Sequence, residues 1–299
     1  MARPAQPSRS SAGPLRLRSA LVRTLTTLDR EIEHGLGHTV LSPEEIHDIH
    51  RDMRRLASGL SVWARLVPAR QRESVQELSR RVRRLARLVG RVRDRDVTTA
   101  LLTPEGPATV RSEELRLWHE FLGRLREDTH TGRELLRAFL RTERQGGLFD
   151  RAKGLVDLGP RGDATRGLHK ILAEERRRHQ GRVRKAHRKA QRDPTSRRLH
   201  RLRIRIRQWR HLATLEVAAR STTNRPPPPS WRRLQARLGK LHDLDVALAT
   251  VPEDLSDSGP ALRLREKRRK LRRSLRASLE RIASAPEKAT ARAQLRGAP

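Results

Sequence analysis

The chain has 299 residues, and its 68 lysine and arginine residues against 34 acidic residues give a formal net charge of +34 at pH 7. It has no cysteine, which excludes disulfides and thiolate metal sites, and no apolar run near the length of a transmembrane helix. Such an excess of positive charge repels itself in the compact state and indicates a polyanionic partner. Composition leaves nucleic acid, an anionic membrane and inorganic polyphosphate as candidates.

Helical rather than alternating periodicity runs through nearly every ordered-looking stretch, so we predict an all-α fold. Ser42, Pro43 and Glu45 fit an N-cap, a first-turn proline and a capping box at one helix start. In chain order, the expected helices span residues 15–36, 44–66, 68–89, 111–128, 132–144, 164–191, 196–219, 229–250 and 260–283.

The segments outside these helices carry turn-forming residues. Breaks are expected at "TPEGPA", "RQGG", "DLGPRGD", "STTNRPPPPS" and "VPEDLSDSGP". Residues 1–14 lack the apolar segment of a secretory signal and are expected to form a disordered basic arm. Residues 286–299 are expected to form a flexible tail. We therefore expect a cytoplasmic protein.

Two motifs occur twice in the same order. Residues 46–56 read "IHDIHRDMRRL" and residues 199–209 read "LHRLRIRIRQW". Residues 85–97 read "LARLVGRVRDRDV" and residues 234–246 read "LQARLGKLHDLDV". Because the two motifs recur with nearly the same separation, we interpret the chain as two copies of one helical unit, an N-terminal repeat over about 15–150 and a C-terminal repeat over about 164–285.

The first motif divides into two faces on a helix. At about 100° per residue, the apolar side chains gather on one face and the imidazoles and guanidiniums on another. In the first copy the cationic face carries His47, His50, Arg51 and Arg54, and in the second it carries His200, Arg203, Arg207 and Arg210. Solvated helix faces usually mix charges of both signs, so this cationic stripe indicates an anionic ligand.

The second motif adds a further basic line and a pair of acids. Its cations include Arg84 and Arg91 in the first copy and Arg233 and Lys240 in the second. The D-x-D pairs are Asp94 with Asp96 and Asp243 with Asp245. They fit either a Mg²⁺ site that bridges to phosphates or, as we prefer, caps and salt bridges that orient the basic residues. Gly90 and Gly239 would permit a close helix approach or a kink.

These two motifs resemble those of the CHAD domain, whose pattern is H-x-x-R-x-x-x-[RK]-x-x-R followed by L-G-x-x-[RH]-D-x-D-V, with the set present twice. The second copy fits well. The first copy matches at His47 and Arg54, has His50 where arginine is usual, and has Ala57 in place of the last arginine. The resemblance covers about residues 15–285 and implies that these residues form a single CHAD domain.

The resemblance implies two tandem, pseudo-symmetric helical bundles around a basic cavity. It places His47, Arg54, His200, Arg203, Arg207 and Arg210 in the cavity lining, with His50 in place of an arginine and with Arg93 and His242 added from the second motif. CHAD domains bind inorganic polyphosphate and can direct proteins to polyphosphate granules. They are not known as catalysts, and no cofactor or metal site is expected. Arg201 and Arg205 are expected to face outward.

Two other functions remain open. The net charge equally suits a nucleoid-associated or other nucleic-acid-binding protein, in which the cations would lie on an outer ridge. An enzyme acting on polyphosphate would need carboxylates, and only the D-x-D pairs supply them. We therefore predict a non-enzymatic protein that binds polyphosphate, associates with its granules and binds nucleic acid weakly, with no membrane partner. Its oligomeric state is left open. Histidine protonation predicts tighter binding at mildly acidic pH.

Overall fold

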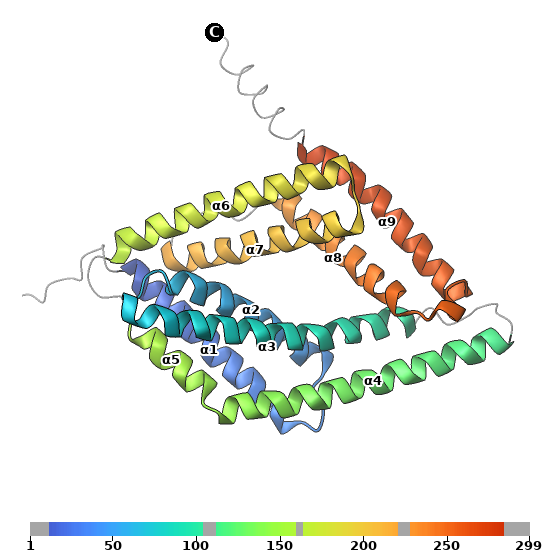
Figure 1. Ribbon diagram of the computed structural model, residues 1–299, viewed down its shortest axis with the longest axis horizontal. Helices are drawn as coiled ribbons and strands as arrows, with labels where there is room; N and C mark the ends of the chain where they lie inside the picture. Colours follow the sequence, from blue (N-terminus) through green and yellow to red (C-terminus); the bar gives the residue numbers. More distant parts are fainter. Residues whose placement is uncertain (1–11, 104–111, 160–163, 221–227, 284–299) are drawn as a thin grey trace, which may run out of the picture. The chain divides into compact units, whose positions relative to one another are not determined.

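The computed structural model describes residues 12–103, 112–159, 164–220 and 228–283. Over these residues the fold is all-α, with nine α-helices, one short 3₁₀ helix at Glu253–Leu255 and no strand (Figure 1). The predicted all-α class is confirmed. The helices are α1 Ala12–Gly37, α2 Pro43–Trp63, α3 Ala69–Leu102, α4 Ser112–Gln145, α5 Leu148–Asp157, α6 Ala164–Arg192, α7 Ser196–Arg220, α8 Pro229–Thr250 and α9 Gly259–Ala283.

The chain divides into two compact units. Unit 1 is drawn from Met1–Asp96, Leu125–Arg178 and His211–Pro226, and unit 2 from Val97–Arg124, His179–Arg210 and Pro227–Pro299. Both motifs of the first copy therefore fall almost wholly in unit 1, and both motifs of the second copy fall in unit 2. The tandem pseudo-symmetric bundles and the basic cavity stay predictions.

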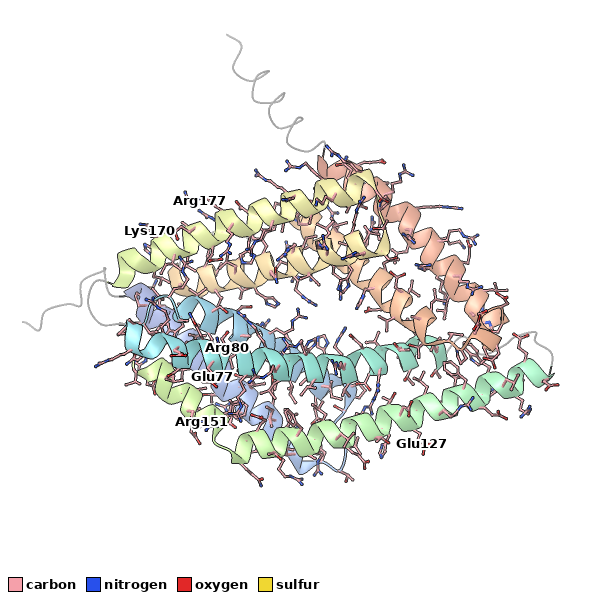
Figure 2. All side chains as sticks on the ribbon, in the orientation of Figure 1. Glu77, Arg80, Glu127, Arg151, Lys170 and Arg177 are labelled. Atoms are coloured by element: carbon pink, nitrogen blue, oxygen red, sulfur yellow. The ribbon has the colours of Figure 1, made fainter. Side chains whose placement is uncertain are left out.

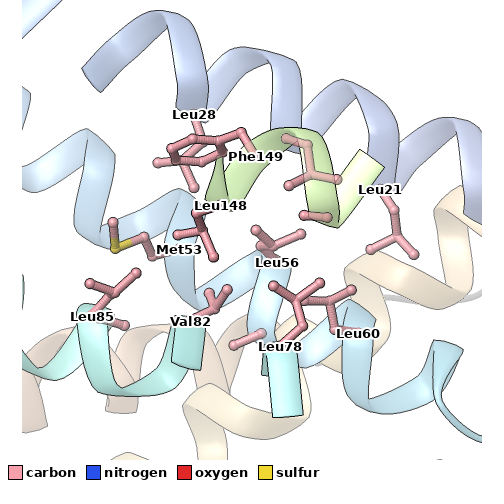
Figure 3. Packing of buried hydrophobic residues seen from close by; sticks show 14 of the residues in the cluster. Leu21, Leu28, Met53, Leu56, Leu60, Leu78, Val82, Leu85, Leu148 and Phe149 are labelled. Atoms are coloured by element: carbon pink, nitrogen blue, oxygen red, sulfur yellow. The ribbon is translucent and has the colours of Figure 1, made fainter. Parts of the chain in front are cut away.

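Unit 1 has a large apolar core formed where α1 packs on α2 and α5. Figure 3 shows Leu21 and Leu28 of α1, Met53 and Leu56 of α2 and Phe149 of α5 around this core. Each is at most 4% exposed. Burial of side chains of this size stabilises a fold by about 1.5–3 kcal/mol each. The 3.6-residue spacing of the apolar positions places them on one face of each helix.

Unit 2 has its own, smaller core. Leu199, Leu202 and Ile206 of α7 are at most 2% exposed, and Trp209 and Trp231 pack against them with their ring centroids 6.0 Å apart. The helices α8 and α9 run antiparallel, since Arg237 meets Ser278 while Asp245 meets Arg268. The apolar face predicted for the first motif is thus confirmed.

Helix boundaries agree with the sequence where capping residues mark them. Ser42 is the N-cap of α2, and its hydroxyl accepts from the backbone N–H of Glu45 while that carboxylate accepts from the N–H of Ser42. Pro229 opens α8, at a position where its missing N–H costs nothing. The capping box predicted at Ser42 is confirmed.

Three helical segments differ from expectation. The third helix continues past residue 89 to Leu102, because the apolar period continues through buried Val89 and Val92. The segments expected at 111–128 and 132–144 form one helix, α4, in which Gly132 lies against Arg95 of α3. The helix α5 was not predicted, although the two expected breaks flank it. The expected arm and tail lie outside the described residues, apart from residues 12–14, which belong to α1.

Candidate functional site

The first-motif helix of unit 1, α2, has the two faces that its sequence predicts. Its apolar face is at most 1% exposed and consists of Ile46, Ile49, Met53, Leu56 and Leu60. On the cationic face His47 is exposed, and His50, Arg51 and Arg54 are half-buried. Partial burial holds the nitrogens of long cationic side chains at the surface while their carbon stems pack on the core.

The second-motif helix, α3, lies antiparallel to α2 and meets it at Gly90. The hydroxyl of Ser79 donates to the carbonyl of Ala57 near one end of the pairing, at 3.2 Å. Farther along, a Cβ atom built on Gly90 would lie 3.1 Å from Nε2 of His50. The close neighbour of Gly90 is therefore the imidazole of His50, which fills the space that the missing side chain leaves, whereas nothing lies within 4 Å of a Cβ atom built on Gly239.

Arg51 differs from its neighbours because three carboxylates surround it. Its guanidinium pairs with Asp48, with Asp52 at 3.0 Å and with Glu31 of α1 at 3.4 Å. Burial raises the pKa of Glu31 to about 7, and the charges of Asp52 and Asp48 add to this effect against those of Arg51 and Arg55. Arg51 thus contributes less unbalanced positive charge than the sequence predicted for it.

In unit 2 the two motifs meet through a pair of histidines. His200 of α7 and His242 of α8 place their Nδ1 atoms 3.3 Å apart, with ring centroids at 4.8 Å. Farther along, Arg210 donates to Gln235 at 2.7 Å, so α7 and α8 also run antiparallel. The structure brings together two predicted site residues that are 42 positions apart in the chain. On α7, Arg203 and Arg207 are half-buried.

Several predicted site residues are exposed cationic or imidazole groups without a neutralising acid. No described residue forms an ion pair or hydrogen bond with any of these five, which are His47, Arg84, Arg91, Arg233 and Lys240. Figure 2 shows further basic side chains on the described helices, among them Arg80 of α3, Arg151 of α5 and Lys170 of α6. Exposed cations that lack internal partners are available to an external anion.

The second acid of each D-x-D pair forms a salt bridge with an arginine from a later helix. Asp96 accepts from Arg133 of α4 at 2.6 Å, and Asp245 accepts from Arg268 of α9 at 2.5 Å. Burial raises the pKa of Asp96, while the hydrogen bond from Arg133 acts in the opposite direction. These two acids form salt bridges, as expected, but the arginines that they hold lie outside the two motifs. Arg93, a predicted site residue, pairs with Asp94 at 3.3 Å.

A pocket of about 440 Å³ lies between α8 and α9 in unit 2. Its lining includes the predicted Arg233 and two further arginines, Arg237 and Arg281. Arg237 and Arg281 both donate to the hydroxyl oxygen of Ser278, which also lines the pocket. Among the residues that the structure describes, no acid lines this pocket. The hydroxyl of Ser278 donates to the backbone carbonyl of Ser274, so the guanidinium groups are the donors that suit a phosphate oxygen here.

A second basic pocket, of about 590 Å³, was missed by the sequence reasoning. It lies at the turn between α6 and α7, and five cations line it, namely Lys189, Arg192, Arg197, Arg198 and Arg201. Asp193 also lines it and pairs with Arg198. Arg201 is exposed as expected, while Arg205 is half-buried and donates to Gln208. The cation density around "DPTSRR" could have indicated this pocket, whereas helical periodicity could not, because a turn brings the two helices together.

His187 is a buried histidine outside both motifs. It is 5% exposed, and its Nε2 lies 3.0 Å from the carbonyl oxygen of Leu279 on α9. Burial lowers the pKa of His187, although the hydrogen bond to that carbonyl acts in the opposite direction. A neutral, buried ring that donates to a backbone carbonyl has a structural role in the core of unit 2.

Comparisons with known proteins bear on the family and on the fold of the chain. The family model of the CHAD domain matches residues 20–252. A crystal structure of the CHAD domain from the plant Ricinus communis is similar over 94% of each chain, with a TM-score of 0.56 and 18% identity. No curated protein matches the sequence. Among the described residues, no helix is long and apolar enough to cross a membrane.

The similarity to the plant structure concerns the fold alone, because the identity is low. The family model carries the stronger argument, since it spans most of the chain and includes both copies of both motifs. The paired helices α2 with α3 and α7 with α8 are the places where those motifs come together. The chain therefore belongs to the CHAD domain family.

Proposed function

We propose that the chain binds inorganic polyphosphate through the cationic faces of α2 and α3 in unit 1 and of α7 and α8 in unit 2. The observation that carries this proposal is the repeated pairing of the two motif helices. In unit 1, His50 of α2 meets Gly90 of α3. In unit 2, His200 of α7 meets His242 of α8. When the two copies are aligned, His200 lies three residues before the position of His50, and His242 lies three residues after the position of Gly90. In an antiparallel pair, a step of three residues back along one helix is matched by a step of three residues forward along the other. The two copies therefore pair their motif helices in the same register.

The same register supports the duplicated unit that we propose as the architecture. It presents one set of imidazoles and guanidiniums in each copy, and a polymer of phosphates can contact such sets in succession. The proposed tandem bundles would enclose these sets in a basic cavity. Within the proposal, all fourteen residues predicted from the sequence bind the polymer, with Arg51 contributing least because acids already surround it.

The chemistry of the side chains favours polyphosphate over nucleic acid. Polyphosphate carries about one charge per phosphate and has no bases, so it needs cations and no stacking surface. Aromatic residues make up only 2% of the chain, whereas single-stranded nucleic acids are usually bound by stacking on aromatic rings. The planar fork of arginine matches phosphate oxygens in a bidentate manner. Binding driven by ion pairing should fall steeply as salt rises.

The histidines make the proposed binding dependent on pH. Two protonated rings would repel each other at the 3.3 Å separation between the Nδ1 atoms of His200 and His242. A polyanion beside the pair would offset this repulsion by supplying countercharge. We expect polyphosphate to bind more tightly at pH 6 than at pH 7.5, and proton uptake should accompany binding. Equal affinity at both pH values would count against the role of these histidines.

The first experiment is a competition between two polyanions. Labelled long-chain polyphosphate bound to the pure protein at near-physiological salt is challenged with duplex DNA at matched phosphate concentration. We expect DNA to leave most of the polymer bound. Ready displacement by DNA would instead favour the second candidate function, a nucleoid-associated protein, for which the net charge of +34 is the supporting observation.

A matched pair of variants separates a specific site from bulk charge. The double variant Arg203→Gln with Arg207→Gln removes two cations of the first motif, and Arg184→Gln with Arg188→Gln removes two exposed cations of α6 in the same unit, also four residues apart. We expect the first variant to weaken binding about tenfold or more, which corresponds to about 1.4 kcal/mol, and the second to weaken it far less. Equal losses would refute the site. Circular dichroism checks that both variants fold.

The proposal also covers location and catalysis. A protein that binds the polymer selectively would associate with polyphosphate granules in the cytoplasm, which fluorescence microscopy of the tagged chain tests. We propose a binding protein without catalysis, because Asp96 and Asp245 are already engaged by arginines. Release of phosphate by the pure protein with Mg²⁺, abolished by Asp94→Ala or Asp243→Ala, would overturn this part of the proposal.

A further inference from the structure

Three potential metal ligands converge where α1 ends and α2 begins, on a part of unit 1 outside the two motifs. Nδ1 of His34 and Nδ1 of His38 each lie 3.0 Å from the same carboxylate oxygen, Oε1 of Glu45. The two imidazole rings stand nearly perpendicular, with centroids 4.6 Å apart. Their side chains are 70% and 50% exposed, so an ion can reach them from solvent.

The carboxylate in this cluster is held in place from its other side. Oε2 of Glu45 accepts from the backbone N–H of Ser42 at 2.7 Å, which is one half of the capping box of α2. The side chain of Glu45 is only 15% exposed. Metal ligands in proteins are commonly oriented in this way by a second hydrogen bond, which fixes the direction of the free oxygen.

The backbone positions of the two histidines are set by the end of α1 and by the turn that follows it. His34 lies in the last turn of α1, and the backbone N–H of His38 bonds to the carbonyl of Gly35 at 3.3 Å just beyond the helix end. At Gly35 a Cβ atom would lie 2.5 Å from the side chain of Leu41, so the turn back toward α2 packs closely there. This packing brings the two imidazoles over Glu45.

We propose that His34, His38 and Glu45 bind a divalent transition metal ion, with Zn²⁺ as the best fit. Two imidazole nitrogens and one carboxylate oxygen are typical zinc ligands, and bonds of about 2.0–2.1 Å in a tetrahedron set neighbouring ligand atoms about 3.3 Å apart. The two nitrogen-to-oxygen distances of 3.0 Å are close to that value, and all three ligand atoms lie within 4.8 Å of one another. A water molecule from solvent would complete the four ligands.

Bound zinc would tie the end of α1 to the start of α2, beside the buried core of unit 1. A ligand that binds only the folded state stabilises it in proportion to the logarithm of its concentration over Kd. The proposal is independent of polyphosphate binding, because none of its three residues belongs to the cationic faces. It can therefore be tested in phosphate-free buffer without reference to the proposed function.

The experiment uses the full chain, treated with chelator and titrated with Co²⁺, whose absorption in the visible region reports a tetrahedral site. Zn²⁺ is then added to displace it. Two variants remove ligands, His38→Ala and Glu45→Gln, and the second keeps the helix cap because glutamine also serves in a capping box. The control is His130→Ala. His130 is exposed and pairs with Glu134, and within the described part of the chain no second histidine joins this pair.

We expect the wild type and His130→Ala to bind one Co²⁺ with the tetrahedral spectrum, and Zn²⁺ to displace it at equimolar amounts. His38→Ala and Glu45→Gln should bind both ions at least about tenfold more weakly and lose the spectrum. Zinc should raise the Tm of the wild type and not of these two variants. Identical spectra, affinities and Tm shifts in wild type and variants, or an octahedral spectrum throughout, would overturn the proposal.

Discussion

Replacing Gly90 by alanine tests whether His50 packs over this position, and Gly239 supplies the matched control from the second copy. An alanine in a helix interior is about 1 kcal/mol more favourable than glycine. At Gly239 nothing lies within 4 Å of the added Cβ, so Gly239→Ala should realise this gain in full. At Gly90 the added Cβ would lie 3.1 Å from Nε2 and 3.4 Å from Cε1 of His50, so the ring must move.

The magnitude follows from these two effects. Overpacking typically costs about 1–3 kcal/mol, which offsets or exceeds the gain in helix propensity. Gly90→Ala should therefore range from neutral to about 2 kcal/mol less stable than wild type, while Gly239→Ala should be about 1 kcal/mol more stable. Truncation of His50 to alanine removes the clash, so adding Gly90→Ala to His50→Ala should stabilise the chain.

The assay is urea unfolding followed by circular dichroism. It compares the wild type, the two single variants and the double variant of the Gly90–His50 cycle with Gly239→Ala. Polyphosphate affinity is measured alongside, and we expect Gly90→Ala to lower it while Gly239→Ala leaves it unchanged. If Gly90→Ala stabilised the chain as much as Gly239→Ala, and the cycle showed no coupling with His50, the packing of the imidazole over α3 would be refuted.

Three further predictions concern the charged and titratable groups in the two units. Asp96→Ala leaves the mostly buried Arg133 without its carboxylate and should lower the free energy of unfolding by about 3 kcal/mol. Asp245→Ala should lower it by about 1 kcal/mol, because the Asp245–Arg268 pair is more exposed. Equal losses in urea unfolding would contradict this prediction. The pKa of Glu31 is raised from 4.5 to about 7, so its contribution to stability is present below pH 4.5 and is lost as pH rises through 7. Between pH 4.5 and pH 8, the stability of Glu31→Gln should therefore rise relative to wild type by at most about 3 kcal/mol. If thermal unfolding gave the same stability difference between the two proteins at every pH, the raised pKa of Glu31 would be wrong. Burial lowers the pKa of His187 from 6.5, so the contribution of its neutral ring to stability is present above pH 6.5 and is lost as pH falls. His187→Gln can still donate to the carbonyl of Leu279, so this variant should lose less stability than wild type at acidic pH. An unchanged dependence of stability on pH would disprove this prediction.

Local patterns were sufficient for the helical class and for much of the element order. The spacing of apolar residues predicted which face of α2 and of α7 is buried, because a helix places every third or fourth residue on the same side. The capping residues at Ser42 marked a helix start, because capping involves only neighbours in the chain. Glycine at 90 and 132 did not end a helix, since contacts with His50 and Arg95 from other helices override the weak local preference.

The sequence by itself determined the all-α class, the duplicated motifs and the candidate cations, because these depend on composition and on spacing along one helix. Only the tertiary structure decided which of those cations face acids, as Arg51 does, and which meet a partner from another helix, as His200 meets His242. The basic pocket at the turn between α6 and α7 and the cluster of His34, His38 and Glu45 also arise only on folding. The physical reason is that charge neutralisation and ligand geometry depend on distances between atoms of different helices, which no periodicity along one helix specifies.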